Sequence, residues 1–271
     1  MIKFLLQTVN DRIRHDFVFE LENAIEYQNW RENEIYAAYC SLEDIKDGCK
    51  FIDSDEIFDY IPVGTVEFVY AFIDKFIKVH GSKSIRPLNV PKELFKFAGR
   101  KIMNVSVSSD AKIRSCLAKK LEQYKYVFIK SNDIIKSDLN SSYNPLEINN
   151  KKILPNGNYQ ISEYIDIETE YRCFIYNDKL IGIQYYSGNF EKFPNVRRIN
   201  DMVKHYQYDN GNGKAPQSWT LDVAVTGKGE TVVMECHEFY SCGLYGFNDY
   251  NALPYMFVRT FNNIKKRLLQ K

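Results

Sequence analysis

Three side chains of one short segment, Asp222, Glu235 and His237, have the types and spacing to do chemistry together. Runs of β-branched residues surround both carboxylates, as is typical of strands, and the glycines of Gly227-Lys-Gly229 suit a hairpin turn between them. Strand alternation then places His237 on the same face as Glu235. If the two carboxylates are paired across this hairpin, their oxygens can converge on a hard cation such as Mg²⁺, which carboxylates and substrate phosphates usually hold jointly.

The simpler interpretation of these carboxylates is that they are solvated surface charges, which is the commoner situation for acidic residues. Apolar neighbours argue instead that at least one side of the hairpin is buried. They are Val223, Val232, Val233 and Met234. A carboxylate that points inward needs a partner. We therefore expect Glu235 to serve either a functional site or a structural ion pair.

Two cationic residues lie at or within other strand-like runs. Lys130 closes the apolar run 126–130, where a lysine is usually a solvated strand end but is also well placed to bind a nucleotide phosphate. Arg172 lies in a run of apolar and aromatic residues. It is either paired with Glu170 or Glu163 on a sheet face, or held as a fixed fork for a phosphate.

A further basic segment, residues 193–214, carries Arg197, Arg198, Lys204 and His205. One interpretation is a solvated helix and loop. The other is a basic rim over an anionic substrate, and the sequence leaves both open.

The composition is that of a globular protein with a real core. The 271 residues are 45% hydrophobic and 26% charged, which suits one large or two moderate domains. A net charge of +1 gives no general electrostatic argument for nucleic acid or an anionic membrane as partner. The six cysteines include no Cys-x-x-Cys pair, so buried, reduced thiols are expected. No segment approaches the ~18 apolar residues of a membrane helix, and we expect a cytoplasmic protein.

Hydrophobic periodicity predicts the elements that position these residues. Strands are expected over residues 2–6, 34–40, 100–105, 126–130, 159–166, 170–176, 180–186, 221–225 and 231–234. Helices are expected over 66–79, with Gly64 or Thr65 as cap, 111–122 and 250–269. An irregular segment with two prolines, residues 80–94, separates a small α/β unit at 1–95 from the rest. The polar segment 136–152 is expected to be a mobile loop.

Several motifs occur in an order that is itself informative. They are Ile61-Pro-Val-Gly-Thr-Val-Glu-Phe68, Gly99-Arg-Lys101, Val127-Phe-Ile-Lys130, Ser162-Glu-Tyr-Ile165, Glu170-Tyr-Arg172 and the hairpin of Asp222 and Glu235. Together they resemble an ATP-grasp ligase, and more narrowly the phage and bacterial subgroup marked by two arginines and a lysine. The resemblance implies an α/β (α+β) fold. An ATP-grasp domain at 96–271, with two α+β subdomains clasping ATP, would follow an N-terminal α/β domain at 1–95.

The resemblance also implies which residues contact ATP. They are Lys101, Lys130, Glu163, Tyr164, Ile165 and Glu170. Lys130 would bind the α- and β-phosphates. Glu163, with the backbone of Tyr164 and Ile165, would form the hinge that binds adenine. Glu170 would contact the ribose.

The remaining implied roles concern phosphate transfer and the cation. Arg172, together with Arg198 or the arginine before it, would hold phosphate or an acyl-phosphate intermediate. Asp222 and Glu235 would bind Mg²⁺, with His237 where the family usually has asparagine. Imidazole is a poorer Mg²⁺ ligand than an amide oxygen. His237 therefore points to another metal, a substrate contact or altered activity.

The implied reaction joins a small-molecule or peptide carboxylate to an amine through an acyl phosphate, with release of ADP and phosphate. The segment 136–152 would be the flap that excludes water. Three alternatives remain. They are a phosphotransferase on the same scaffold, a nucleotide-binding module without turnover, and an interaction protein with ordinary surface charges.

Overall fold

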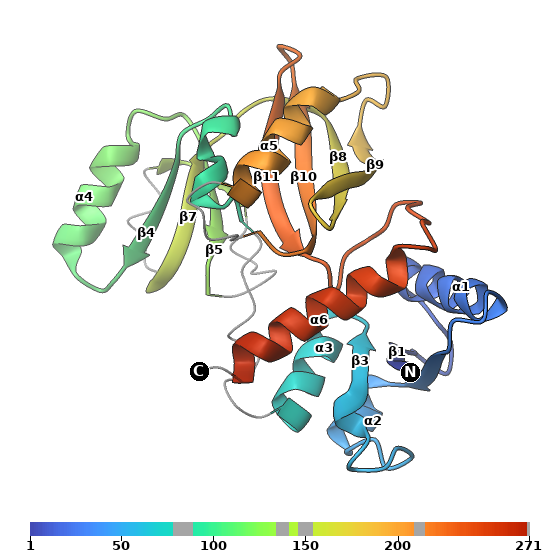
Figure 1. Cartoon of the computed structure of the whole chain (residues 1–271). Helices are drawn as coiled ribbons and strands as arrows, with labels where there is room; N and C mark the ends of the chain where they lie inside the picture. Colours follow the sequence, from blue (N-terminus) through green and yellow to red (C-terminus); the bar gives the residue numbers. More distant parts are fainter. Residues whose placement is uncertain (78–88, 134–140, 146–153, 209–214, 270–271) are drawn as a thin grey trace.

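The computed structural model describes residues 1–77, 89–133, 141–145, 154–208 and 215–269 (Figure 1). Within these residues the strands form one three-stranded and two four-stranded sheets. The predicted flap, 136–152, lies outside the described residues except for a short strand, and so does most of the predicted connection 80–94. No helix in the described ranges is both long and apolar enough to span a bilayer.

The N-terminal unit is a parallel sheet with helices. Its strands are β1 (Ile2–Gln7), β2 (Ile35–Cys40) and β3 (Tyr60–Val63), in the order β2-β1-β3. Its helices are α1 (Asp16–Trp30), α2 (Leu42–Lys46) and α3 (Val66–Phe72), with a 3₁₀ turn at Ile57–Asp59 and a π-helical turn at Ile73–Ile77. The central strand β1 and β3 are almost continuously buried, as expected for a parallel sheet covered on its faces. Thr65 caps α3 by accepting from the Phe68 N–H, which confirms the predicted helix start.

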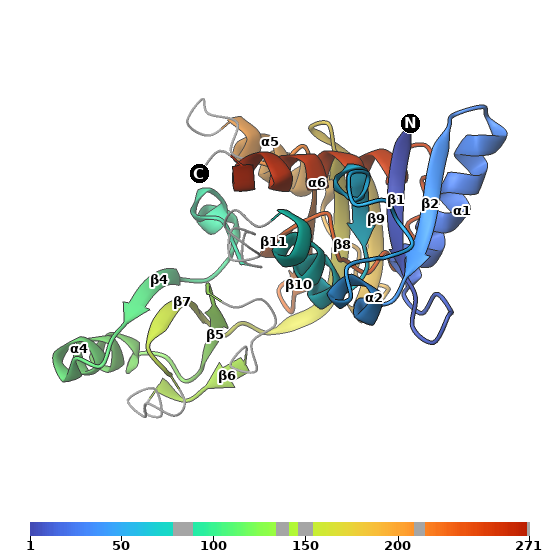
Figure 2. The ribbon, with the colours of Figure 1, turned by 90° about the horizontal axis from the view of Figure 1, so that it is seen from below.

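The second sheet is small and antiparallel. Its strands are β4 (Ile102–Val107), β5 (Val127–Ser131), β6 (Ser141–Tyr143) and β7 (Gly157–Glu163), in the order β4-β7-β5-β6. Helix α4 (Ala111–Leu121) packs Leu117 and Leu121 against a core that includes Val127 and Ile161. Seen from below, this unit and the N-terminal strands lie at opposite ends of the molecule (Figure 2).

The third sheet carries most of the residues selected from the sequence. Its strands are β8 (Ile167–Tyr176), β9 (Lys179–Gly188), β10 (Ser218–Thr226) and β11 (Thr231–Glu238), in the antiparallel order β11-β10-β8-β9. Helix α5 (Val196–Tyr208) packs Met202 and Val203 against one face, in a core with Cys173, Leu221 and Val233. Alternation along the strands therefore turns residues 172 and 222 to the opposite face.

The C-terminal helix α6 (Leu253–Leu269) joins the third sheet to the N-terminal unit (Figure 1). Its buried side chains, such as Phe257 and Phe261, belong to the same core cluster as Phe68 and Phe72 of α3 and Phe239 after β11. The last helix of the predicted second domain thus shares a core with the predicted first domain. The boundary at residue 95 stays a prediction.

A short segment links the two four-stranded sheets. The backbone N–H of Val90 donates to Gln160 Oε1 and Gln160 Nε2 donates to Val90 O, both at 2.9 Å. The backbone N–H of Cys236 donates to Asn89 O at 2.9 Å. Residues 89–90, which precede the 3₁₀ helix Lys92–Phe97, are therefore bonded to β7 on one side and β11 on the other.

Candidate functional site

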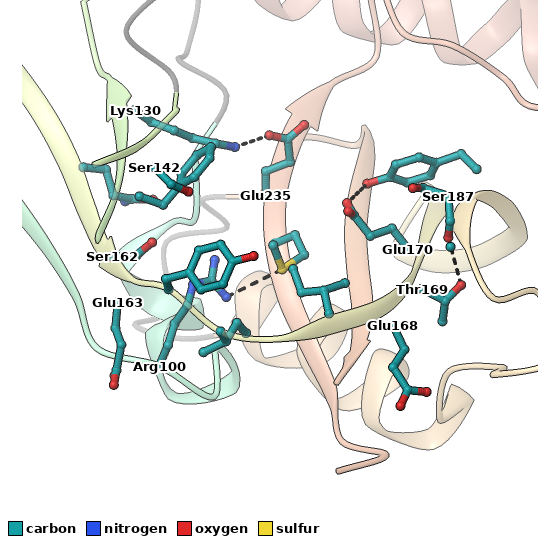
Figure 3. A pocket seen from close by; sticks show the side chains of 18 residues that line it. Arg100, Lys130, Ser142, Ser162, Glu163, Glu168, Thr169, Glu170, Ser187 and Glu235 are labelled. Atoms are coloured by element: carbon teal, nitrogen blue, oxygen red, sulfur yellow. Dashed lines mark hydrogen bonds and ion pairs between the residues drawn. The ribbon is translucent and has the colours of Figure 1, made fainter. Parts of the chain in front are cut away.

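A cavity of about 530 Å³ lies between the two four-stranded sheets (Figure 3). Side chains from β5, β6 and β7 form one wall, and side chains from β8, β9 and β11 form the other. The linker 164–166, between β7 and β8, closes one end. The volume is in the range of sites for small molecules and cofactors, ~300–1,000 Å³.

The cavity brings together six of the residues selected from the sequence. They are Lys130, Glu163, Tyr164, Ile165, Glu170 and Glu235. Five others lie outside its lining: Lys101, Arg172, Arg198, Asp222 and His237. The predicted hinge residues lie at the cavity because the chain passes there from one sheet to the next.

Lys130 on β5 and Glu235 on β11 form an ion pair across the cavity, marked by a dashed line in Figure 3. Burial opposes ionisation of Glu235, but the charge and hydrogen bond of Lys130, together with the charge of Arg172 and the His237 side chain, outweigh it, and the pKa of Glu235 lies below its ordinary value. The cation predicted to bind phosphate is thus neutralised by a carboxylate predicted to bind metal. This pair joins the two walls.

Arg172 and Asp222 form a second, bidentate pair within the third sheet. Arg172 Nε and Nη2 donate to the two carboxylate oxygens of Asp222 at 2.8 and 2.7 Å. Of the two alternatives left open for Arg172, the pairing with Glu170 or Glu163 is therefore wrong, because residues 172 and 222 are direct partners in the β8–β10 ladder. Burial raises the pKa of Asp222 to about 6, although the guanidinium partly opposes the rise.

The predicted pairing of the two carboxylates is confirmed. Asp222 and Glu235 are register partners in the β10–β11 ladder, and His237 pairs with Thr220 two positions along. The His237 ring is buried, with its centroid 5.1 Å from that of Tyr240. Among the residues that the structure describes, no three His, Cys, Asp or Glu side chains are grouped to hold a metal ion. The three-ligand metal site of Asp222, Glu235 and His237 is not assembled here, and its metal role stays a prediction.

Sequence reasoning missed Arg100. Its side chain lines the cavity, and Nη1 donates to Ala98 O at 3.0 Å and Val233 O at 2.9 Å. No carboxylate of the described residues pairs with it, and burial lowers its pKa to about 10, so it remains cationic at neutral pH. Nη1 also lies 3.7 Å from Met234 Sδ. A partly buried cation whose described partners are all neutral favours an anionic ligand.

The signal for Arg100 was present in Gly99-Arg-Lys101. Gly99 has a positive φ of 64°, and a Cβ there would lie 2.6 Å from Val232 Cγ1. The absence of a side chain lets the chain approach β11 and directs Arg100 toward the cavity. Lys101 is exposed, with Nζ 5.9 Å from the centre of the Tyr124 ring.

The model of one family, the ATP-grasp domain of the R-two-K clade, family 2, matches residues 97–254. The chain belongs to this ATP-grasp family. The match spans the two four-stranded sheets and the cavity between them, so the predicted ATP-grasp fold is confirmed. No curated protein matches the chain significantly. The narrower phage and bacterial subgroup stays a prediction.

Several solved structures have a similar fold and align with nearly the whole of this chain. The D-cycloserine synthetase DcsG aligns with a TM-score of 0.59 at 13% identity, over 98% of this chain and 99% of the other. D-alanyl-alanine synthetase A from Vibrio cholerae gives 0.57 at 10% identity, over 96% and 98%. N5-carboxyaminoimidazole synthetase from Staphylococcus aureus gives 0.53 at 9% identity, over 97% and 77%. At these identities the likeness concerns the fold.

The remaining predicted residue of this ATP-grasp site, Arg198, lies on the other side of the third sheet. It belongs to α5, where Nε donates to Thr231 O at 2.6 Å and the guanidinium carbon lies 5.7 Å from the centre of the Phe97 ring. The neighbouring Arg197 is exposed. The structure therefore places Arg172, but neither of these arginines, on the face of the sheet that carries Asp222.

Proposed function

We propose that this ATP-grasp protein is an ATP-dependent ligase that joins a carboxylate to an amine. The proposal rests on the cavity between the two four-stranded sheets. Two cationic side chains, Arg100 and Lys130, come from different segments of the chain and line this one cavity. Membership of the family supports ATP as the nucleotide. The synthetase names of the proteins with similar folds support a bond-forming reaction.

Within this proposal the cavity binds the nucleotide. The linker that contains Tyr164 and Ile165 takes the adenine by its backbone, with Glu163 beside it. Glu170, on the opposite wall, takes the ribose. Lys130 and Arg100 bind the phosphates, because a triphosphate is the kind of anion that a point charge and a guanidinium fork both recognise.

The two carboxylates of the β10–β11 hairpin have donor chemistry that suits a magnesium ion. Asp222 and Glu235 supply oxygen ligands from paired positions, and Mg²⁺ is commonly held by one or two carboxylates together with substrate phosphates. These two residues would hold the ion, which would offset charge on the phosphate oxygens. The His237 imidazole suits Mg²⁺ less well, and we assign it no ligand role.

The proposed chemistry has two steps. A substrate carboxylate oxygen attacks the γ-phosphorus of ATP, the bond to the β-γ bridging oxygen breaks, and ADP leaves. The amine nitrogen then attacks the acyl carbon, phosphate leaves, and the amine gives up a proton as the amide forms. Lys130 and Arg100 would stabilise the charge that develops on the transferring group.

The test is a screen of amino acids and peptides for ADP release that requires both a carboxylate and an amine. Lys130→Ala and Glu235→Ala are each expected to abolish that release, while circular dichroism shows folded protein. Full turnover in both variants would contradict the proposal. ADP release that needs an alcohol but no amine would indicate a phosphotransferase instead.

A nucleotide-binding module without turnover is the second candidate. The pairing of Glu235 with Lys130 and of Asp222 with Arg172 favours it, because both carboxylates already have cationic partners. His237 also favours this candidate, because imidazole is a poor ligand for Mg²⁺. Tight ATP binding with no ADP release across the whole screen would support this candidate over the ligase.

A further inference from the structure

The loop that follows β11, residues 241–247, is held by a residue from the other end of the chain. Asp16, the first residue of α1, accepts from the backbone N–H groups of Leu244 at 2.7 Å and Tyr245 at 3.3 Å. Tyr245 has a positive φ of 50°, which non-glycine residues seldom adopt. The Asp16 carboxylate therefore stabilises a backbone conformation that the loop would not favour alone.

The Tyr245 side chain connects this loop to the cavity. Its ring stacks on that of Tyr186, with centroids 5.0 Å apart and planes 21° from parallel. The Tyr186 hydroxyl donates to Glu170 Oε2 at 2.6 Å, and Glu170 lines the cavity (Figure 3). The orientation of Glu170 thus depends on a stacked ring that the loop supports.

The same loop holds Arg172. Arg172 Nη1 donates to Gly243 O at 3.2 Å, and its guanidinium carbon lies 5.2 Å from the centre of the Tyr245 ring. Nε and Nη2 of this arginine donate to Asp222. A shift of the loop would therefore change the positions of both Glu170 and the Arg172–Asp222 pair.

We infer that Asp16 is a positioning residue for the nucleotide site, acting through the loop 241–247 on Glu170 and Arg172. Asp16 lies outside residues 97–254, the part matched to the family, so the N-terminal unit contributes to a site built from the two four-stranded sheets. The inference rests on the proposed function, because it takes ATP as the ligand of the cavity. Asp16 itself does not line the cavity.

A second aspartate that accepts from two backbone N–H groups, Asp249, serves as the control that separates positioning from a general loss of stability. Asp249 accepts from the backbone N–H groups of Asn251 and Ala252 in its own turn before α6, and it lies outside the network described above. Asp16→Ala is expected to weaken the binding of ATP with Mg²⁺ about tenfold, equal to ~1.4 kcal/mol, in isothermal titration calorimetry. Asp16→Asn keeps an acceptor oxygen and should restore most of the affinity, and Asp249→Ala should bind as the wild type does.

Wild-type affinity in Asp16→Ala would overturn the inference, and so would an equal loss in Asp249→Ala. A second measurement needs no ligand, so it tests the positioning even if the wild type binds no ATP, an outcome that would contradict the proposed function alone. Nitration of Tyr186 by tetranitromethane, followed by mass spectrometry, should be faster in Asp16→Ala than in the wild type or Asp249→Ala. Equal nitration rates in all three proteins would show that Asp16 does not hold the stack.

Discussion

Asp222 and Glu235 lie opposite each other on β10 and β11, yet they pair with cations from different sheets. Arg172, the partner of Asp222, comes from β8 of the same sheet. Lys130, the partner of Glu235, comes from β5 across the cavity. A separation of the two walls would therefore break the second pair and leave the first intact.

The pair across the cavity predicts a coupling between Lys130 and Glu235. Lys130→Met and Glu235→Gln should each lower the free energy of unfolding by about 1–3 kcal/mol, because each leaves a largely buried charged group without its partner. The double variant should lose less than the sum of the two losses. Urea denaturation gives the free energy of unfolding of the wild type, the two single variants and the double variant. Additive losses would mean that the two groups do not interact in solution.

The pair within the sheet predicts a larger effect. Arg172→Met leaves the buried Asp222 carboxylate unpaired and should lower the free energy of unfolding by about 3–5 kcal/mol. Adding Asp222→Asn removes that charge and should recover part of the loss. If Arg172→Met alone were as stable as the wild type in urea, Asp222 would have another partner in that variant.

Arg100 and Lys101 are adjacent in the chain, but only the substitution of Arg100 is expected to weaken ATP binding. Arg100→Met should weaken ATP binding at least tenfold, since it removes a partly buried cation from the cavity lining. The free energy of unfolding of this variant should change by less than about 1 kcal/mol. Losing the two hydrogen bonds destabilises the fold, but the variant no longer has to bury a charge, and the two effects largely cancel. Lys101→Met serves as the comparison and should bind ATP nearly as the wild type does. A greater loss in Lys101→Met would support the ATP contact that the family resemblance implied for Lys101.

The place of Arg198 distinguishes a structural role from a phosphate contact. Its hydrogen bond to Thr231 O fastens α5 to the start of β11. Arg198→Met should therefore lower the free energy of unfolding by about 1 kcal/mol and change ATP affinity less than twofold. Chemical denaturation and calorimetry on the same preparation measure both quantities. A large loss of affinity with unchanged stability would support the phosphate role that the family resemblance implied.

The strands and the central hairpin were predictable because local patterns determine them. Alternating β-branched residues and Gly227-Lys-Gly229 predicted β10 and β11, and they predicted that Asp222 faces Glu235. The β8–β9 turn was predictable for the same reason. Asn177 and Asp178 both have positive φ there, as a two-residue hairpin turn requires.

Helix α1 escaped prediction because its local signals are weak. No side chain caps its first turn, and its apolar residues are mixed with polar ones that are also buried, such as Gln28. Gln28 Nε2 donates to Tyr250 O, a residue 222 positions away, so this buried amide is understandable only in the folded chain.

The site was predictable in its residue types but not in its pairings. The partner of Arg172 depends on the register between β8 and β10, which the pattern of one strand does not contain. The choice between Arg100 and Lys101 depends on how closely Gly99 approaches β11. The contact of Asp16 with Leu244 joins residues 228 positions apart. Such relations arise only when distant segments have been packed together.

The bonds of residues 89–90 to Gln160 and Cys236 connect the two walls of the cavity. The chain also joins the two walls through residues 164–166 between β7 and β8. The walls thus have two separate connections, and we expect any opening of the cavity to be a rotation that keeps both, with the largest displacement far from Val90.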